Sequence, residues 1–309
     1  MKVLLTGGAG FIGSNLSDRL IKEGYDVVVV DNLASGKIEN INPKAVFYQL
    51  DIQDKKILEV FEKERPDFVS HHAAQIDVRR SVADPVLDAK VNVIGTLNIL
   101  ENCRNYGVKR VIFASSGGVL YGEVTNNKKA SEDFPIQPIS PYGITKLCGE
   151  EYLKFYRQTY QISFVILRYA NVYGRRQDPF GEAGVVAIFI QKMLKGERPT
   201  IFGSGSQERD YIHVDDVIEA NLSALTKGDN SSLNIGTGVT TSVQELFLQL
   251  QKITGFSKMP IYAPQRHGEL QRSCLDSSKA KQLLNWSPKK KLTKGLAETV
   301  EYFRKRVTL

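Results

Sequence analysis

The chain has 309 residues, of which 42% are hydrophobic, and this is enough for one large domain or two closely packed domains. No apolar run approaches the ~20 residues that cross a bilayer, and the N-terminus lacks a secretory pattern, so we expect a cytoplasmic protein without membrane contact. The net charge of +7 suits either a nucleic acid or a diphosphate ligand, and the positions of the charges decide between them.

Much of the positive charge lies near the C-terminus, where the basic residues do not alternate with aromatic platforms for bases. We interpret this segment as a solvated helical face and expect no nucleic-acid partner. The basic residues concerned are Lys289, Lys290, Lys291, Lys294, Arg304, Lys305 and Arg306.

Cysteine and histidine are sparse in this chain. The 3 cysteines form no CxxC pair and are too few for a disulfide framework, which favours reduced thiols. The 4 histidines show no HxxxH pattern and no grouping with cysteine at ligand spacing. We therefore expect no metal site.

The first half of the chain alternates short β-branched runs with segments of helical length. Strands that are apolar along their whole length are typical of a parallel sheet covered by helices on both faces. The sequence therefore predicts an α/β fold with a doubly wound, Rossmann-type parallel sheet. The predicted strands are Val3–Leu5, Val27–Val30, Val46–Leu50, Phe68–His71, Val111–Ala114 and Phe164–Leu167.

Beyond about residue 170 the loops become longer and richer in Gly, Arg and Pro. We place a large domain at 1–169 and a smaller α/β domain at 170–309, with short segments around 213–237 returning to the large domain. In the last helix, Leu296, Val300 and Phe303 form a single apolar stripe. The helices predicted here are Val185–Leu194, Val243–Thr254, Ser277–Leu284 and Leu292–Arg306.

A glycine-rich loop joins the first predicted strand to a helical segment, with Gly7, Gly10 and Gly13 spaced as GxxGxxG. Glycine permits the tight turn and lets the backbone approach a pyrophosphate, while free N–H groups at the start of the helix bind the anion. The motif is weak evidence alone, because glycine-rich turns also occur without a ligand.

The second predicted strand ends at Asp31, about twenty residues after the glycine loop, where a carboxylate can accept hydrogen bonds from an adenosine ribose. The same charge repels a 2′-phosphate, and no arginine follows closely. The sequence therefore predicts NAD rather than NADP as the cofactor. The alternatives are that Asp31 caps a turn and that Asp51, after the third strand, is a solvated loop residue.

Tyr142 and Lys146 are four residues apart in a segment with a helical pattern, so both side chains lie on one face. A phenol titrates near ~10, but an adjacent ammonium and a positive nicotinamide stabilise its phenolate, which becomes a usable general base. Ser115 and Ser116 end the fifth predicted strand, beside the expected cofactor crevice. Ser116 is predicted to bind a substrate hydroxyl, with Ser115 as the alternative.

The chain resembles the extended short-chain dehydrogenase/reductase family, and within it the UDP-sugar 4-epimerases, over nearly its whole length. The resemblance implies an NAD-dependent enzyme with a UDP-sugar substrate, in which Ser116, Tyr142 and Lys146 form the catalytic triad. The segments that carry it are TGGAGFIG, DNLASGK, HHAAQ, SSGGVLYG, SPYGITK, RYANVYG, RQDPFGEAGVV, RDYIHVDD, NIGTG and RHGEL.

The resemblance also implies which residues line the two ligand sites. Two arginines would bind the diphosphate, because a planar guanidinium binds its oxygens bidentately, whereas Arg175 and Arg176 are interpreted as surface residues. The NAD site would comprise Gly7, Gly10, Phe11, Ile12, Gly13, Asp31, Asn32, Ser35, Gly36, Asp51, Ile52, Ala73, Ala74, Gln75, Asn92, Tyr142, Lys146 and Tyr169. The UDP-sugar site would comprise Ser116, Asn171, Val185, Phe202, Arg209, Arg266, Glu269 and Ser273, where Glu269 replaces the aspartate common in the family.

The residues after Ser116 indicate the reaction type. Family members that dehydrate or decarboxylate their substrates carry an acid there, but this chain has Gly117 and Gly118. The difference favours a 4-epimerase that works through a transient 4-keto sugar. At the family's gating position Ser273 replaces a large aromatic residue, which implies that UDP-GlcNAc and UDP-GalNAc are accepted alongside UDP-glucose and UDP-galactose.

Two other functions stay open from the sequence. A UDP-uronate 4-epimerase, or another nucleotide-sugar short-chain dehydrogenase, is the enzymatic alternative, although RQDPFGEAGVV resembles the neutral-sugar branch better. An NAD-sensing or RNA-binding protein of the same fold is the non-enzymatic one, but such proteins usually lack the Tyr/Lys pair. The resemblance further implies a homodimer, in which helices of the large domain pair.

Overall fold

The computed structural model describes residues 1–125, 128–180, 184–266 and 268–307. Its main feature is a seven-stranded parallel sheet with the strand order β10-β6-β5-β4-β1-β2-β3. This order confirms the predicted doubly wound fold and adds one strand, β10. The strands are β1 (Lys2–Thr6), β2 (Asp26–Asp31), β3 (Val46–Gln49), β4 (Phe68–His71), β5 (Arg110–Ser116), β6 (Ser163–Tyr169) and β10 (Ser231–Ile235).

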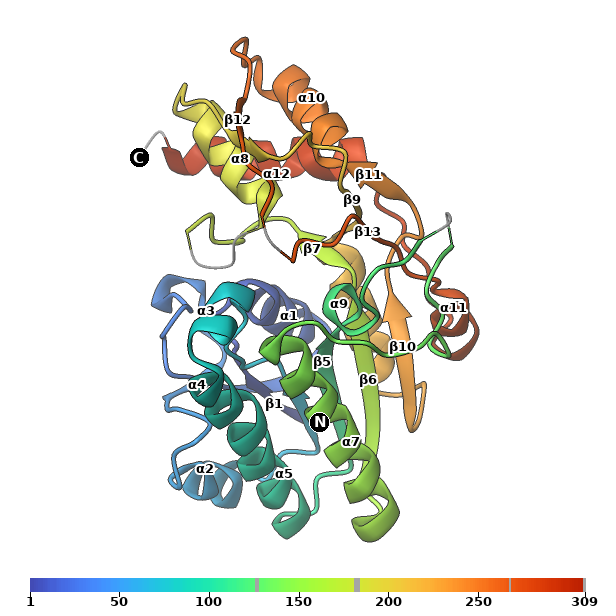
Figure 1. Ribbon diagram of the computed structural model, residues 1–309. Coiled ribbons are helices and arrows are strands. Elements are labelled where there is room, and N and C mark those ends of the chain that lie inside the picture. Colours follow the sequence, from blue (N-terminus) through green and yellow to red (C-terminus); the bar gives the residue numbers. More distant parts are fainter. Residues whose placement is uncertain (126–127, 181–183, 267, 308–309) are drawn as a thin grey trace.

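Helices cover both faces of this sheet (Figure 1). One face carries α1 (Phe11–Lys22), α9 (Val214–Ala224) and α11 (Ser278–Leu284), and the other carries α2 (Ile57–Glu64), α5 (Gly95–Asn105) and α7 (Pro141–Tyr160). Apart from the edge strand β3, which is only partly buried, the strands are largely buried from both sides, which explains their continuous apolar runs. Short elements connect them: η1 (Ile38–Asn40), α3 (Val78–Ala83), α4 (Pro85–Ala89), the π-helical η2 (Lys90–Ile94) and α6 (Gly117–Leu120).

Local sequence signals set the ends of the helix that carries Tyr142. Ser140 caps the start of α7, where its Oγ accepts a 3.2 Å hydrogen bond from the N–H of Gly143, and Pro141 occupies the first turn. The helix ends at Gln161, whose φ of 62° is left-handed. Tyr142 is thus fixed in the first turn of a long helix.

A smaller lobe lies above the sheet in Figure 1, where α8, α10 and α12 pack together around a separate apolar core. Leu296, Val300 and Phe303 are buried in that core, which confirms the predicted apolar stripe of the last helix. The lobe comprises α8 (Val185–Leu194), α10 (Val243–Thr254), α12 (Leu292–Val307), a four-stranded sheet of β7 (Asn171–Tyr173), β9 (Glu208–His213), β11 (Thr240–Ser242) and β13 (Arg272–Ser273), and the pair β8 (Thr200–Phe202) and β12 (Ile261–Ala263).

The chain crosses between the large and small lobes more than once. After β9 in the small lobe, α9 packs on the large sheet and β10 pairs with its edge strand β6. We retain the division at residue 170, with segments around 213–237 returning to the large domain, as a proposal. Among the described helices, none has the length and apolar character needed to cross a membrane.

Candidate functional site

A cleft of about 790 Å³ runs along the carboxyl ends of the sheet strands and reaches the small lobe. This edge is where doubly wound folds bind ligands, because the strand order reverses beside β1. Of the residues predicted for the two ligand sites, the cleft is lined by Gly7, Gly10, Phe11, Ile12, Gly13, Asp31, Asn32, Ser35, Asp51, Ile52, Ala73, Ala74, Gln75, Ser116, Tyr142, Lys146, Tyr169, Asn171, Val185 and Arg209. Six others lie outside the lining and are placed below: Gly36, Asn92, Phe202, Arg266, Glu269 and Ser273.

The glycine loop between β1 and α1 has the geometry of an anion-binding turn. Gly7 has a φ of 70°, and an added Cβ would lie 2.7 Å from the backbone nitrogen of Ala73, so no larger residue fits. A Cβ at Gly13 would collide with the carbonyl oxygen of Gly7. No side chain caps the N-terminus of α1, which leaves its N–H groups available to a pyrophosphate.

Asp31 stands at the end of β2 with its carboxylate held by backbone donors. The N–H of Ala9 lies 2.9 Å and the N–H of Leu33 2.8 Å from its oxygens. Burial raises the pKa of Asp31 above its usual value, and these two hydrogen bonds oppose that effect. Gly36 lies directly behind it, since a Cβ there would be 2.9 Å from Asp31 Oδ1. The carboxylate that is predicted to bind the ribose is therefore oriented in part by the glycine loop, through Ala9.

Asp51 lines the cleft beside Asp31, at the end where we expect the adenosine. Its carboxylate accepts a 2.7 Å hydrogen bond from Asn32 and a 2.8 Å bond from the N–H of Gln53. The side chains of Asn32 and Asp51 thus bridge the ends of β2 and β3. The arrangement fits an adenosine, and because Asp51 is a partly exposed loop residue, the alternative of a solvated loop residue stays open.

Asn92 lies behind the cleft instead of lining it. Its side chain forms two hydrogen bonds with the backbone of Gln75, at 2.8 and 2.9 Å, and a 3.1 Å bond to Thr145 on α7. Asn92 belongs to the π-helical turn η2, a kind of irregularity that is frequent at functional sites. It therefore holds the Gln75 loop from behind the cleft lining, and a direct contact with the cofactor stays a prediction.

The two serines at the end of β5 differ in their contacts. Ser115 donates a 2.6 Å hydrogen bond to the buried carboxylate of Glu150. Both serines line the cleft, and a Cβ added at Gly118 would lie 3.9 Å from Ser116 Oγ. Ser116 is thus the serine whose hydroxyl faces the cleft without a buried partner on α7.

Tyr142 and Lys146 lie on one face of α7 and both line the cleft. The Lys146 ammonium is 5.9 Å from the centre of the Tyr142 ring and donates a 2.8 Å hydrogen bond to the carbonyl of Ala114. Burial lowers the pKa of Lys146 to about 8, against the opposing effects of Asp88 and Glu150. The tyrosine thus has a buried cation at hand to stabilise its phenolate.

Tyr169, at the end of β6, also lines the cleft, where its ring stacks on His72 at a centroid distance of 6.4 Å. Its hydroxyl bonds to the side chain of Asn221 at 3.0 Å, and burial raises the pKa of this phenol. Tyr169 therefore contributes a flat, neutral wall beside Tyr142 and Lys146.

The small lobe contributes the other end of the cleft. Asn171 and Tyr211 pair across β7 and β9, and Arg209 lies two residues before Tyr211, so both side chains reach the same face of the strand. Tyr211 was not predicted, although this alternation was readable from the sequence. Its hydroxyl is buried without a protein partner, as expected for a ligand contact.

Four predicted substrate residues lie beside this end of the cleft without lining it. The Arg266 guanidinium stacks on Phe202 at 3.8 Å from the ring centre, and Glu269 is 3.8 Å from the Arg209 guanidinium. Ser273 pairs with Arg209 between β13 and β9 and is buried. Residues 181–183 and 267, which belong to two of the quoted motifs, lie outside the described residues.

Gln177 is a cleft residue that sequence reasoning missed. Its Nε2 donates a 3.0 Å hydrogen bond to the carbonyl of Val172, and its Oε1 is buried without a partner. The adjacent Arg175 and Arg176 form ion pairs with Asp215 and Asp18, outside the cleft. No simple pattern distinguishes the glutamine from the two arginines before it.

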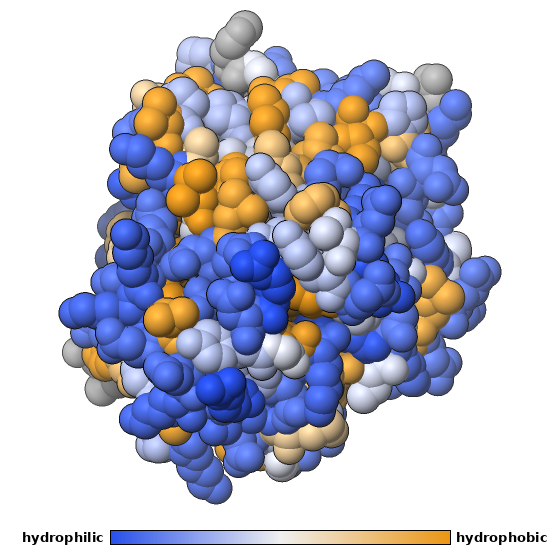
Figure 2. Space-filling view, turned by 90° about the horizontal axis from the view of Figure 1, so that it is seen from below, coloured by the Kyte–Doolittle hydropathy of each residue, from blue (hydrophilic) through white to orange (hydrophobic). Residues whose placement is uncertain are grey.

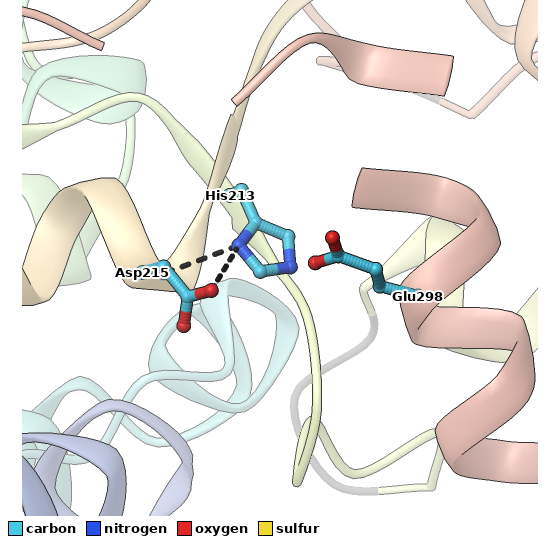
Figure 3. A group of neighbouring side chains, drawn as sticks. All are labelled: His213, Asp215 and Glu298. Carbon is cyan, nitrogen blue, oxygen red and sulfur yellow. Dashed lines mark hydrogen bonds and ion pairs between the residues drawn. The ribbon is translucent and has the colours of Figure 1, made fainter. Parts of the chain in front are cut away.

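Away from the cleft, His213, Asp215 and Glu298 gather between β9, α9 and α12 (Figure 3). Nδ1 of His213 accepts a 3.2 Å hydrogen bond from the N–H of Asp215. The Lys290 ammonium lies 2.7 Å from Glu298 and 3.4 Å from Asp215. A protein cation therefore already contacts both carboxylates, and the expectation of no metal stays a prediction.

Comparison with known proteins agrees with this geometry. The family model described as "NAD dependent epimerase/dehydratase family" matches residues 3–236. The UDP-glucose 4-epimerase of Mycolicibacterium smegmatis is 45% identical, over 99% of both chains.

Two solved structures are also very similar. The UDP-glucose 4-epimerase of Thermotoga maritima, solved with UDP-glucose, has a TM-score of 0.98 and 53% identity over 99% of this chain and 100% of that one. The Thermus thermophilus UDP-glucose 4-epimerase, solved with NAD, has a TM-score of 0.94 and 45% identity over 98% and 99% of the two chains. Together, the cleft and these matches show that the chain belongs to the NAD-dependent epimerase/dehydratase family.

Proposed function

We propose that the protein is an NAD-dependent 4-epimerase that interconverts UDP-glucose with UDP-galactose and UDP-GlcNAc with UDP-GalNAc. One observation carries the proposal: Ser116, Tyr142 and Lys146 line the same cleft as the glycine loop and Arg209. The donor set fits NAD, because the uncapped start of α1 suits a pyrophosphate and Asp31 suits an unphosphorylated ribose.

The side chains of the catalytic triad transfer the O4 proton and hold the sugar hydroxyl. The Tyr142 phenolate removes the proton from O4 of the sugar, Ser116 holds that hydroxyl, and the Lys146 ammonium stabilises the phenolate. When bound, NAD accepts a hydride from C4 and returns it, so no net oxidation results. Tyr142 then returns the proton to O4 after the 4-keto sugar has rotated to present its opposite face.

The reaction requires a firm hold on the diphosphate and a loose hold on the sugar. Arg209 lines the cleft, and we assign it and the neighbouring Arg266 to the diphosphate. Holding the substrate by its nucleotide leaves the sugar free to present either face to the nicotinamide.

Gly118 favours epimerisation over dehydration. A Cβ at this position would be 3.8 Å from Asn171 Oδ1 and 3.9 Å from Ser116 Oγ, so an acidic side chain there would reach the sugar. Glycine supplies no acid for a leaving hydroxyl. A Cβ at Gly117 would instead lie 2.7 Å from Leu275, away from the site.

The first test incubates the purified protein, without added NAD, separately with UDP-galactose, UDP-GalNAc and UDP-GalA. Conversion of the first two to their 4-epimers, resolved by proton NMR, is the expected result. Conversion of UDP-galactose alone would remove the 2-acetamido substrates, and conversion of UDP-GalA alone would favour the uronate epimerase. No conversion even with added NAD would leave a binding role.

We also propose that the enzyme is a cytoplasmic homodimer in which the α7 helices of two copies pack together. Ile144, Tyr152 and Phe155 lie on one side of α7 and are 51%, 37% and 49% exposed, and Ile94 on η2 is 55% exposed. Figure 2 shows apolar side chains gathered toward one side of the molecule seen from below, with a mainly hydrophilic opposite side.

The cysteines support the proposed cytoplasmic location. The three cysteines of the protein are free thiols, which suits a reducing compartment.

Light scattering after size exclusion tests the dimer. The wild-type protein should have twice the mass of a single chain. The Phe155→Glu variant should have a mass closer to that of the monomer, because a charge would be buried in the interface. Leu58→Glu, which alters an exposed residue of α2, is the control and should leave the mass unchanged. A monomeric wild type would contradict the proposal.

A further inference from the structure

Asp88, on the short helix α4, is a buried carboxylate with no assigned role. Its side chain is fully buried, and its oxygens accept hydrogen bonds from Gln75 Nε2 at 2.8 Å, Asn92 Nδ2 at 3.1 Å and Thr145 Oγ1 at 2.7 Å. All three donors are neutral. A buried charge is costly when neutral groups alone surround it, so a functional reason for it is to be sought nearby.

The three donors connect Asp88 to both halves of the site. Gln75 belongs to the cleft lining that we assign to NAD, and Thr145 directly precedes Lys146 on α7. Asn92 joins them, because it also bonds to the backbone of Gln75 and to Thr145. Asp88 thus lies at the junction of the cofactor loop and the helix that carries Tyr142 and Lys146.

Lys146 is a buried cation on the helix that Asp88 contacts through Thr145. Its buried ammonium donates a hydrogen bond only to the neutral carbonyl of Ala114 among the contacts described. Glu150, the other buried carboxylate on this side, is already bonded to Arg168 at 2.6 Å. Within the described part of the chain, neither Asp88 nor Lys146 forms an ion pair, so neither charge is neutralised by a direct partner.

Among the surrounding titratable groups, Asp88 is the one that most favours the protonated form of Lys146. Of the groups that raise the pKa of Lys146, Asp88 is the largest and Glu150 follows. The histidines at the end of β4 are neutral at ordinary pH, because burial lowers the pKa of each to about 3. The groups facing Lys146 from its own and the neighbouring elements are Tyr142, Glu150, Asp88, His71, His72 and, through Glu150, Arg168.

We infer that Asp88 is a positioning residue of the reaction, which holds the Gln75 loop and α7 in register and supplies a negative charge to the buried surroundings of the Lys146 ammonium. This inference rests on the proposed function for its catalytic consequence. The electrostatic part concerns only Asp88 and Lys146 and can be measured without substrate.

The Asp88→Asn variant tests both parts. It keeps the shape and one acceptor oxygen but removes the charge, so the ammonium loses its stabilisation. We expect the alkaline limb of the kcat profile to move to lower pH by about one unit, kcat at neutral pH to fall, and KM for the UDP-sugar to change little. Asp84→Asn, at the exposed cap of the same helix, removes an equal charge and should leave the profile unchanged.

A direct measurement uses protein labelled with ¹³C at the lysine ε-carbon and free of cofactor and substrate. The Lys146 signal is identified by its loss in Lys146→Met, and it should titrate near the pKa of about 8 in the wild type and lower in Asp88→Asn. Equal titration of Lys146 in the two proteins, together with an unmoved alkaline limb, overturns the inference. Inactivity of the wild type on every UDP-sugar would instead defeat the proposed function and leave this titration meaningful.

Other variants cover the case in which Asp88→Asn does not fold. Asp88→Ser is smaller and leaves room for a water, and the same shifts are expected of it. Thr145→Val keeps the carboxylate and loses only the hydroxyl contact, so kcat should fall with the alkaline limb in place. An unchanged kcat in Thr145→Val would overturn the positioning role.

Discussion

Ser115 donates a 2.6 Å hydrogen bond to the carboxylate of Glu150, which is fully buried behind the cleft. Glu150 is bonded in turn to Arg168, whose guanidinium reaches it through Nε and Nη2. The hydroxyl of Ser115 is therefore part of a buried polar network, and the hydroxyl of Ser116, which also lines the cleft, is the one that we assign to the substrate. Two adjacent serines on one strand thus have separate tasks.

Alanine substitutions should separate these two tasks. Ser116→Ala is expected to lower kcat on UDP-galactose about 100-fold or more, because the O4 hydroxyl loses its partner during proton transfer, with little change in melting temperature. Ser115→Ala should instead cost about 1–3 kcal/mol of unfolding free energy, because Glu150 loses a buried donor, and retain most of its activity. Steady-state kinetics and thermal unfolding of both variants check this, and the reverse pattern would assign the catalytic role to Ser115.

Tyr142→Phe should abolish turnover while NAD still binds. The substitution removes only the phenolic oxygen, so the cleft keeps its shape but has no base, and kcat should fall by about 10²–10⁴. The bound cofactor is measured by its release on denaturation. Tyr160→Phe, on the same helix but exposed, is the matched control; substantial activity in Tyr142→Phe would remove the proposed base.

Asp31→Asn should weaken NAD binding by about 10- to 100-fold, the loss expected for one or two hydrogen bonds to a charged acceptor. The ratio of the affinities for NAD and NADP should fall in the same variant, because an amide replaces the carboxylate that repels the 2′-phosphate. Calorimetry with cofactor-free protein measures both affinities. Asp26→Asn, at the exposed start of the same strand, serves as the control, and an unchanged NAD affinity in Asp31→Asn would reduce Asp31 to a turn cap.

Arg209→Lys should raise KM for the UDP-sugar about tenfold or more with a smaller change in kcat. A lysine keeps the charge but cannot bind two phosphate oxygens through a planar fork. It also gives up the 2.8 Å hydrogen bond from Arg209 Nη2 to the carbonyl of Leu270. Arg175→Lys, which alters an ion pair outside the cleft, should leave KM unaltered, and equal effects of the two variants would argue against a substrate contact.

Long regular elements were predictable from the sequence because their patterns are local. The helices Val185–Leu194 and Val243–Thr254 occur with the predicted ends, and the second of them begins with a complete capping box at Ser242. Strand β10 was missed, because its pairing with β6 joins residues far apart in the sequence. The three-residue strands β7 and β11 are too short to show a period.

Among the site residues, too, those marked by a local pattern were predictable and those set by contacts between distant residues were not. Residues at strand ends, such as Asp31 and Ser116, were predictable because parallel strands end at one edge of the sheet. Asp88 was not, since its donors come from three separate places in the chain and nothing in its local sequence marks it as buried. Packing decides which polar side chains are withdrawn from water, and that information is not local.

Ser273→Tyr tests the breadth of substrate choice. Ser273 is buried and pairs with Arg209, which lines the cleft, so we expect a large ring there to extend toward the cleft and take up the volume of a 2-acetamido group. We expect kcat/KM for UDP-GalNAc to fall about 100-fold, while UDP-galactose is still converted, because a shape mismatch of this size costs a few kcal/mol. Ser273→Ala should accept both substrates. Parallel loss of both activities in Ser273→Tyr, with a lowered melting temperature, would mean that the ring disrupts the β9–β13 pairing and that Ser273 is no gate.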